Sequence, residues 1–188
     1  MKVKVKVPAT SANLGPGFDV AGLALTLYNT FTFELSNQGI NITGCPKQFC
    51  NEENMTYQAF KRAATVCGLD YHGVNVECSG DVPYTRGLGS SSTCIVAGIV
   101  GAFAFKDKVE DRQAILELAT AIEGHPDNVA PAIFGGLTVS VMEEDKVLTL
   151  NIPVKHDYRF VTLIPPFTLS TEQSRSVLPQ ILPRSDAI

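Results

Sequence analysis

Apolar and polar residues alternate along several short segments of the chain, which is the pattern of strands with one buried face. In the first of these segments, residues 2–7, the side chains of Val3, Val5 and Val7 share a face. Residues 135–142 and 147–152 alternate in the same way around a charged turn and predict a hairpin. Further strands are expected at 30–35, 72–79 and 159–164, and the segment 21–27 is mainly apolar.

Helices are predicted where apolar residues recur at helical spacing. Asn54 is expected to cap a helix that runs to about Cys67 and ends at Gly68. The apolar segment 94–105 is expected to form a buried helix, because it is too short to cross a membrane. A further helix is stopped by Gly124. Its apolar face consists of Ile115, Leu118, Ala119 and Ile122.

Strands and helices are mixed without the strict alternation that is typical of parallel sheets. We therefore expect a two-layer α+β fold with antiparallel strand pairing. Residues 39–54 are polar and are expected to be irregular, whereas residues 171–175 are expected to form a short helical piece.

Composition narrows the range of functions. The 188 residues, of which 45% are hydrophobic, suffice for one ordinary domain with a real core, or for part of a larger protein. A net charge of −4 and the lack of a basic block argue against a nucleic-acid partner. The N-terminus has no signal-peptide pattern, and the five cysteines match no zinc-binding spacing. These features predict a cytoplasmic protein with reduced cysteines and no membrane segment.

The most informative polar segment is 83–93, where Gly87 and Gly89 precede three consecutive serines and the start of the apolar helix. A glycine- and serine-rich loop that leads into a helix presents backbone N–H groups and the positive end of the helix dipole. The segment therefore predicts a phosphate site, although it lacks the Gly-Lys-Ser/Thr ending of the common nucleotide loop. The alternative is a plain glycine turn followed by a serine cap, for which one serine would be enough.

Two further polar clusters lie on either side of this segment. Residues 123–128 read Glu-Gly-His-Pro-Asp-Asn, and residues 8–19 form a loop rich in proline and glycine. The polar side chains of that loop are Thr10, Ser11, Asn13 and Asp19. They could face a ligand or bond to their own backbone. His125 could likewise be structural, whereas Glu123 at the negative end of a helix dipole is mildly unfavourable unless it binds a ligand.

Together the three clusters resemble the GHMP kinases, the superfamily that includes galactokinase, homoserine kinase and mevalonate kinase. Pro-x-x-x-Gly-Leu-Gly-Ser-Ser-Ser at 83–92 resembles the ATP-binding motif of the superfamily. The runs at 8–19 and 123–131 are similar to those of the homoserine kinase family, and the likeness covers nearly the whole chain. The resemblance implies phosphorylation of the side-chain hydroxyl of L-homoserine by ATP in threonine biosynthesis, on a ribosomal-protein-S5-like domain.

The resemblance also implies roles for single residues. Ser91 or Ser92 would bind Mg²⁺ together with Glu123, with Glu117 as the fallback for the glutamate, and Asn54 would lie near the adenine. The loop that would wrap the ATP phosphates consists of Pro83, Tyr84, Thr85, Arg86, Gly87, Leu88, Gly89, Ser90, Ser91, Ser92 and Thr93.

Four residues resemble the family's binding site for the amino-acid head group of homoserine. Asn13 and Asp19 would hold this head group, and Asp19 would supply the carboxylate that its ammonium needs. Thr171 and Arg175 match the family's Thr-x-x-x-Arg, and arginine is the best bidentate donor to a carboxylate. On its own, Arg175 could also be an ordinary surface arginine.

Asp127 and Asn128 would lie near the reacting hydroxyl. In mevalonate kinases an Asp base is assisted by a Lys of the first motif, but Ser11 occupies that position here. Because phosphoryl transfer needs mainly alignment and charge neutralisation, we expect Asp127 to accept a hydrogen bond from the hydroxyl. The alternatives are another GHMP small-molecule kinase of the shikimate or mevalonate type, a non-catalytic ligand-binding protein on the same fold, or a structural subunit.

The resemblance further implies two domains. Residues 1–157 would be the ATP-binding N-terminal domain, and residues 158–188 would begin the C-terminal domain. Family members continue with a third glycine-rich motif and another substrate-binding arginine, so this chain is expected to be a fragment or a natural truncation. The surface thereby left exposed is expected to favour aggregation or a homodimer.

Overall fold

A computed structural model describes residues 1–144, 146–155, 157–164, 166–167, 176–177, 179 and 181–186. Its strands are β1 (Lys2–Ala12), β2 (Ala21–Ser36), β3 (Gly39–Thr43), β4 (Gly73–Gly80), β5 (Leu137–Glu143) and β6 (Lys146–Ile152). Its helices are α1 (Met55–Cys67), α2 (Ser90–Ala104), α3 (Arg112–Glu123) and α4 (Pro126–Phe134), with short 3-10 turns η1 (Lys47–Phe49) and η2 (Arg184–Asp186). Among these described helices, none has the length and apolar character needed to cross a membrane.

The strands form one sheet that is built around the long strand β2. Strand β1 pairs antiparallel with β2 along one edge, while β4 and β5 pair antiparallel with different parts of the other edge. Strand β6 returns antiparallel to β5, as the predicted hairpin requires. Among the described strands, only β3, which pairs with β4, is parallel to its partner. The α+β prediction with mainly antiparallel pairing is therefore confirmed.

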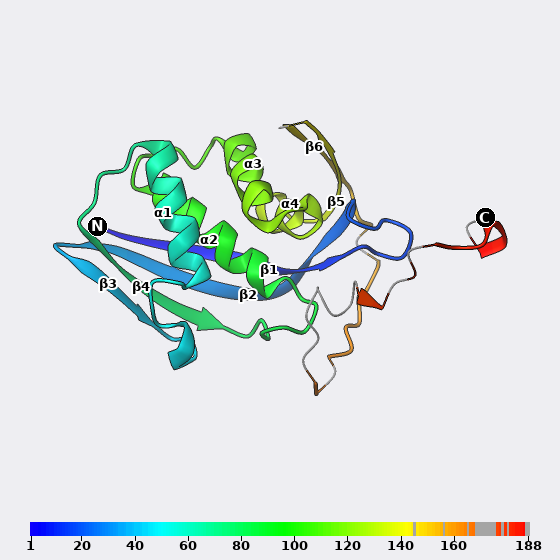
Figure 1. Ribbon diagram of the computed structural model, residues 1–188, viewed down its shortest axis with the longest axis horizontal. Coiled ribbons are helices and arrows are strands. Elements are labelled where there is room, and N and C mark those ends of the chain that lie inside the picture. The colour runs from blue at the N-terminus through cyan, green and yellow to red at the C-terminus, as the bar shows by residue number, and fades with distance from the viewer. Residues whose placement is uncertain are drawn as a thin grey trace.

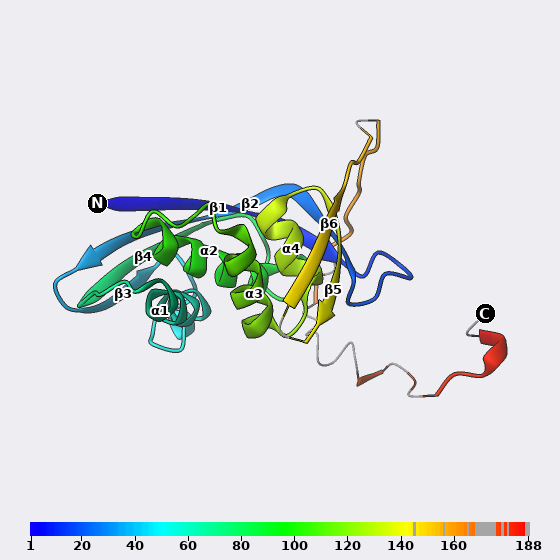
Figure 2. The ribbon, with the colours of Figure 1, turned by 90° about the horizontal axis from the view of Figure 1, so that it is seen from above.

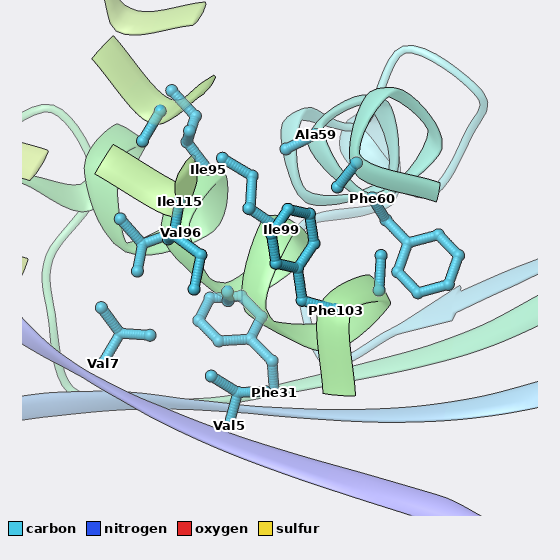
Figure 3. Close-up of a cluster of buried hydrophobic side chains, with 14 of the residues drawn as sticks. Val5, Val7, Phe31, Ala59, Phe60, Ile95, Val96, Ile99, Phe103 and Ile115 are labelled. Atoms are coloured by element: carbon cyan, nitrogen blue, oxygen red, sulfur yellow. The ribbon is translucent and has the colours of Figure 1, made fainter. Parts of the chain in front are cut away.

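The four helices α1 to α4 cover one face of this sheet, so the domain has two layers (Figures 1 and 2). Figure 3 shows Val5, Val7 and Phe31 pointing from the strands toward the helices. Helix α2 lies in the middle of the helical layer, where Ile95, Ile99 and Phe103 are buried. The rings of Phe33 and Phe60 stack with centroids 5.5 Å apart. The core therefore joins β1 and β2 to α1 and α2, and it fixes the start of α2 over one end of the sheet.

Glycine lets α1 and α2 approach closely. A Cβ atom at Gly98 would lie 2.3 Å from the backbone oxygen of Thr56 on α1. Because no side chain fits there, the two helices pack backbone to backbone at this point. Helix α1 also begins and ends where expected: the Asn54 side chain accepts from the N–H of Tyr57, and Gly68 takes the left-handed conformation at the C-cap.

Three predicted strand boundaries are wrong. Strand β1 continues through Ala12, with a bulge between Pro8 and Thr10, so Thr10 lies in a strand rather than in a loop. A proline is tolerated beside a bulge because the ladder of hydrogen bonds is already interrupted there. Segments 21–27 and 30–35 form the single strand β2, and the supposedly irregular segment 39–54 contains β3.

One helix was not predicted, and one predicted strand is wrong. Residues 126–134 form helix α4, because a proline fits the first turn of a helix, where its missing N–H is not needed. Residues 159–164 form no strand and are exposed, because an alternating pattern gives a strand only where a partner is available. The predicted helical piece at 171–175 lies outside the described residues. The domain boundary at residue 157 stays a prediction.

Candidate active site

The three polar clusters meet at the N-terminal ends of α2 and α4. The Thr10 hydroxyl of the first cluster donates to Asn128 Oδ1 of the third cluster at 2.7 Å. Gly89 of the second cluster lies against both, since a Cβ there would be 2.0 Å from Thr10 Oγ1 and 3.2 Å from Asn128 Oδ1. Only glycine fits this meeting point without displacing its neighbours. Segments that are far apart in the sequence therefore form one site.

A cavity of about 860 Å³ opens beside this meeting point. Among the residues to which the resemblance assigns a role in binding or catalysis, those in its lining are Asn13, Asn54, Tyr84, Thr85, Arg86, Gly87, Gly89, Ser90, Ser91, Glu123, Asp127 and Asn128. The remaining described ones, which lie outside the lining, are Asp19, Pro83, Leu88, Ser92, Thr93 and Glu117. Of these, Ser92 and Thr93 are fully buried, and Leu88 packs with Ala9 and Val82.

The loop 83–93 turns through left-handed conformations, with φ values of 52° at Thr85, 70° at Gly87 and 65° at Gly89. The side chain of Asn29 on β2 holds both ends of this loop. Its amide donates to Thr93 Oγ1 at 3.1 Å, and its oxygen accepts from the N–H of Val82 at 3.2 Å. The sequence interpretation missed Asn29, although a polar amide between two apolar strand segments is a signal that could have indicated it.

Helix α2 begins at the cavity without a side-chain cap. Its N-cap is Gly89, and no side chain of the described residues accepts a hydrogen bond from its first turn. The alternative of a plain serine cap is therefore wrong. Gly89, Ser90 and Ser91 all line the cavity, so the uncapped N–H groups of the helix start lie beside it. Such a helix end binds anions through these N–H groups and the positive end of the dipole.

Glu123, the last residue of α3, faces the start of α2. Its Oε1 accepts from the hydroxyls of Ser91 at 2.7 Å and Ser92 at 3.0 Å. Glu117, the fallback candidate, instead accepts from Gln113 Nε2 on its own helix at 2.7 Å. A carboxylate beside two hydroxyls is a set of hard oxygen atoms, which is the type of ligand that Mg²⁺ prefers. This donor set fits the metal that the sequence predicts.

Asp127, in the first turn of α4, is buried, with 1% of its surface exposed. Its Oδ1 lies 2.5 Å from Nδ1 of His125, which also lines the cavity. This hydrogen bond raises the pKa of His125 above its ordinary value, against the opposing effect of burial. Asn128 Nδ2 lies 3.5 Å from the same Asp127 oxygen. The carboxylate is therefore held in place by its neighbours along the chain.

Asn13 and Asp19 form a tight turn next to Asp127. Asn13 Oδ1 accepts from the N–H of Asp19 at 2.9 Å, and both residues have positive φ values, 69° and 57°. Ligand atoms of Asp19, His125 and Asp127 lie within 4.8 Å of one another. Two carboxylates this close give the site a negative end that suits a cationic group. Thr171 and Arg175, which were expected to bind the opposite charge, lie outside the described residues.

Asn54 lines the cavity but is also part of the scaffold. While its oxygen caps α1, its amide Nδ2 donates to the carbonyl of Phe49 at 2.8 Å. The predicted helix cap is thus confirmed. A contact of Asn54 with adenine stays a prediction.

Comparisons with known proteins agree with this arrangement. Residues 54–136 match the model of the GHMP kinases N terminal domain. The chain is 46% identical over 187 residues to a homoserine kinase of Clostridium botulinum (strain Alaska E43 / Type E3) and 48% identical to one of Clostridium beijerinckii. Each alignment covers 99% of this chain but only 63% of the relative. The crystal structure of homoserine kinase from Cytophaga hutchinsonii superposes with a TM-score of 0.79 at 28% identity, over 99% of this chain and 62% of that one.

Proposed function

Because this chain belongs to the GHMP kinases, and is similar to homoserine kinases over almost its whole length, we propose that it transfers a phosphoryl group from ATP to the side-chain hydroxyl of L-homoserine. The product would be O-phospho-L-homoserine, made in the cytoplasm for threonine biosynthesis. The chain spans 63% of the length of these relatives, and residues 1–157 would form its ATP-binding domain.

The observation that carries the proposal is the placement of Glu123. Its carboxylate contacts Ser91 and Ser92 at the uncapped start of α2, and the same cavity is lined by Asp127 and Asn128. A helix end that could bind phosphate therefore lies beside an acidic group and a potential hydroxyl-binding pair. Phosphoryl transfer needs these three parts close together, because its catalysis is mainly positioning and charge neutralisation.

The residues that would hold Mg²⁺ are Glu123 and one of the hydroxyls of Ser91 and Ser92. Bound there, the ion would neutralise charge on the phosphates of ATP. The protein's own contribution to phosphate binding would be the N–H groups of the first turn of α2. The loop 83–93 would close around the same phosphates, with its conformation fixed by Asn29.

The acceptor would bind at the other end of the cavity. Asp19 and Asn13 would hold its ammonium group, and Arg175 with Thr171 its carboxylate. The hydroxyl would donate a hydrogen bond to Oδ2 of Asp127, since Oδ1 already contacts His125. Asn128, oriented by Thr10, would keep this hydroxyl in line with the phosphate. Alignment of this kind, without a strong base, suffices for a loose transition state.

ADP release from MgATP tests the proposal directly. L-homoserine, shikimate and mevalonate would be offered in parallel to the chain, and phosphate incorporation into the acceptor would be checked by mass spectrometry. ADP released only with L-homoserine, matched by phosphohomoserine, is the expected result. Turnover only with another alcohol would contradict the substrate but keep the kinase class. Nucleotide binding without ADP release under any condition would favour a ligand-binding protein instead.

A further inference from the structure

Two cysteines lie side by side at one wall of the cavity, in the segment between β3 and α1. Cys45 is half-buried and lines the cavity, whereas Cys50 is exposed. Their Sγ atoms are 3.6 Å apart, and both are free thiols. In a disulfide the two sulfur atoms are about 2.0 Å apart, so a closure of about 1.6 Å would bond them. In Figure 1 this segment contains the short helical turn η1.

We propose that Cys45 and Cys50 form a reversible disulfide, and that its formation weakens nucleotide binding in the cavity. The effect on the nucleotide rests on the proposed kinase function, whereas the disulfide itself does not. The reduced pair is the resting state, as is usual for redox-sensing thiols in reducing compartments.

The two thiols have different environments, which sets the order of the reaction. Burial raises the pKa of Cys45 to about 11, and the hydrogen bond with Cys50 adds to this effect. The exposed Cys50 therefore reacts first, because the thiolate is the nucleophile and access limits the rate. Its thiolate attacks one sulfur of a low-molecular-weight disulfide such as oxidised glutathione and releases one thiol. Cys45 then loses its proton and attacks Cys50 Sγ, which releases the second thiol.

The reaction balances without a further reagent. The protein loses two electrons and two protons, and the reagent disulfide is reduced to two thiols. A dithiol such as dithiothreitol reverses both steps.

The pair is connected to the cavity through Phe49, which lies inside the ring that the disulfide would close. The centroid of the Phe49 ring lies 6.3 Å from that of Tyr84, and both residues line the cavity. The Phe49 carbonyl accepts from Asn54 Nδ2 at 2.8 Å, and Asn54 Nδ2 also lies 4.0 Å from Cys45 Sγ. A shift of either sulfur therefore changes the contacts of Phe49 and Asn54 in the cavity wall.

The backbone on either side of residues 45–50 is anchored, so it cannot easily absorb a movement of the two sulfur atoms. Gly44 packs against β4 so closely that a Cβ there would lie 1.8 Å from the backbone oxygen of Cys78. The backbone before Cys45 is thus fixed to the sheet, and the backbone after Cys50 is fixed by the Asn54 cap of α1. Movement is therefore directed into the loop 45–50, which carries Phe49.

The other cysteines are poorer partners. Burial raises the pKa of Cys78 to about 12, and Cys67 is buried with its thiol directed at the carbonyls of Ala64 and Ala102. The proposal therefore assigns the disulfide to Cys45 and the exposed Cys50, and predicts that the remaining thiols stay reduced.

Peptide mapping tests the disulfide. The chain would be treated with oxidised glutathione, alkylated, and digested with trypsin without reduction. Trypsin cuts after Lys47, between the two cysteines, so the two resulting peptides remain joined only if Cys45 and Cys50 are bonded.

In parallel, calorimetry would measure the Kd for MgATP of the reduced and the oxidised chain. We expect joined peptides and a Kd for MgATP that rises about fivefold on oxidation, which is the effect of losing about one ordinary hydrogen bond. Dithiothreitol should return the Kd to its value in the reduced chain.

The variant Cys50→Ser is the matched control, since it keeps the other four cysteines and changes an exposed side chain. It should bind MgATP like the reduced chain and should not respond to oxidised glutathione. Separate peptides, or a bond from Cys45 to Cys78 or Cys94, would overturn the assignment. Joined peptides with an unchanged Kd would overturn the effect on the nucleotide. If the reduced chain binds no MgATP, the proposed function fails, and the peptide map alone decides the disulfide.

Discussion

The hydroxyl of Thr10 donates a 2.7 Å hydrogen bond to Asn128 Oδ1 across 118 positions of the sequence. Thr10 belongs to strand β1 of the sheet and Asn128 to the first turn of α4, so this bond joins the two layers at the cavity. Because Oδ1 of Asn128 is the acceptor, its amide nitrogen is directed toward Asp127. Thr10 thereby orients the residue that we propose to align the reacting hydroxyl.

Replacing Thr10 by valine should weaken the fold and the alignment together. The change keeps the shape but leaves the Asn128 oxygen without its donor, which costs about 1–2 kcal/mol of unfolding free energy. Urea denaturation measures this loss. Thr65→Val is the control, since Thr65 is exposed on α1 and its hydroxyl donates to the Lys61 carbonyl of its own helix. Equal effects of the two substitutions would contradict a special role of Thr10.

Glu123→Gln should abolish most of the Mg²⁺-dependent activity, by about 100-fold or more, because charge neutralisation of the phosphates is central to the transfer. Stability should stay the same or rise slightly, since the change removes a negative charge from the C-terminal end of α3. Steady-state kinetics at varied Mg²⁺ concentration gives the answer. Glu117→Gln on the same helix is the matched control and should leave kcat near its original value. A large loss of kcat in Glu117→Gln with little loss in Glu123→Gln would instead assign the metal ligand to Glu117.

Asp127→Asn should lower kcat by about tenfold or more, because the amide cannot accept the hydroxyl's hydrogen bond as strongly as a carboxylate does. The Kd for MgATP should change little, since the phosphate loop is a separate part of the cavity. Kinetics with L-homoserine and calorimetry with MgATP separate the two quantities. Unaltered turnover and unaltered affinity for homoserine would disprove the role assigned to Asp127.

Gly89→Ala should be far more harmful than Gly87→Ala. Both glycines have left-handed φ values, 65° and 70°, so both substitutions cost about 1 kcal/mol of backbone strain. Only the Cβ at Gly89 would collide with Thr10 Oγ1, at 2.0 Å, whereas nothing lies within 4 Å of one at Gly87. We expect an additional loss of about 1–3 kcal/mol for Gly89→Ala, together with weaker MgATP binding. Thermal unfolding of both variants measures the difference, and similar losses would contradict the close approach.

The contact between His125 and Asp127 should make stability depend on pH. The pKa of His125 in the folded state is raised above 6.5, chiefly by this hydrogen bond, with smaller contributions from the charges of Asp127, Glu123 and Asp19. The stabilisation is therefore complete below 6.5 and is lost as the pH rises through the folded-state pKa. Urea unfolding between about pH 6 and pH 9 should show this decline in the wild type and a smaller one in His125→Gln. Identical pH profiles of the unfolding free energy for the wild type and His125→Gln would disprove the role of this contact.

Local sequence signals predicted helices α1 to α3 but missed α4, and they predicted the strand ends poorly. Asn54, Gly68 and Gly124 mark helix ends correctly, because caps and stops depend on the residue itself. The extension of β1 through Pro8 and the parallel strand β3 could not be predicted, because they depend on pairing with β2 and β4. The strand expected at 159–164 shows the opposite error. Its residues alternate as in a strand, but none of the described strands pairs with them.

The sequence by itself determined which chemical groups this protein carries: a glycine–serine segment before an apolar helix, the polar loop at 8–19 and the run from Glu123 to Asn128. These are short-range patterns, and they also carry the family resemblance. Only the tertiary structure decided that Glu123 rather than Glu117 faces Ser91 and that Thr10 orients Asn128. It also brought Cys45 and Cys50 together at the cavity wall. Such contacts depend on how α3, α4 and the β3–α1 segment pack on the sheet, and packing is a property of the whole core rather than of any local pattern.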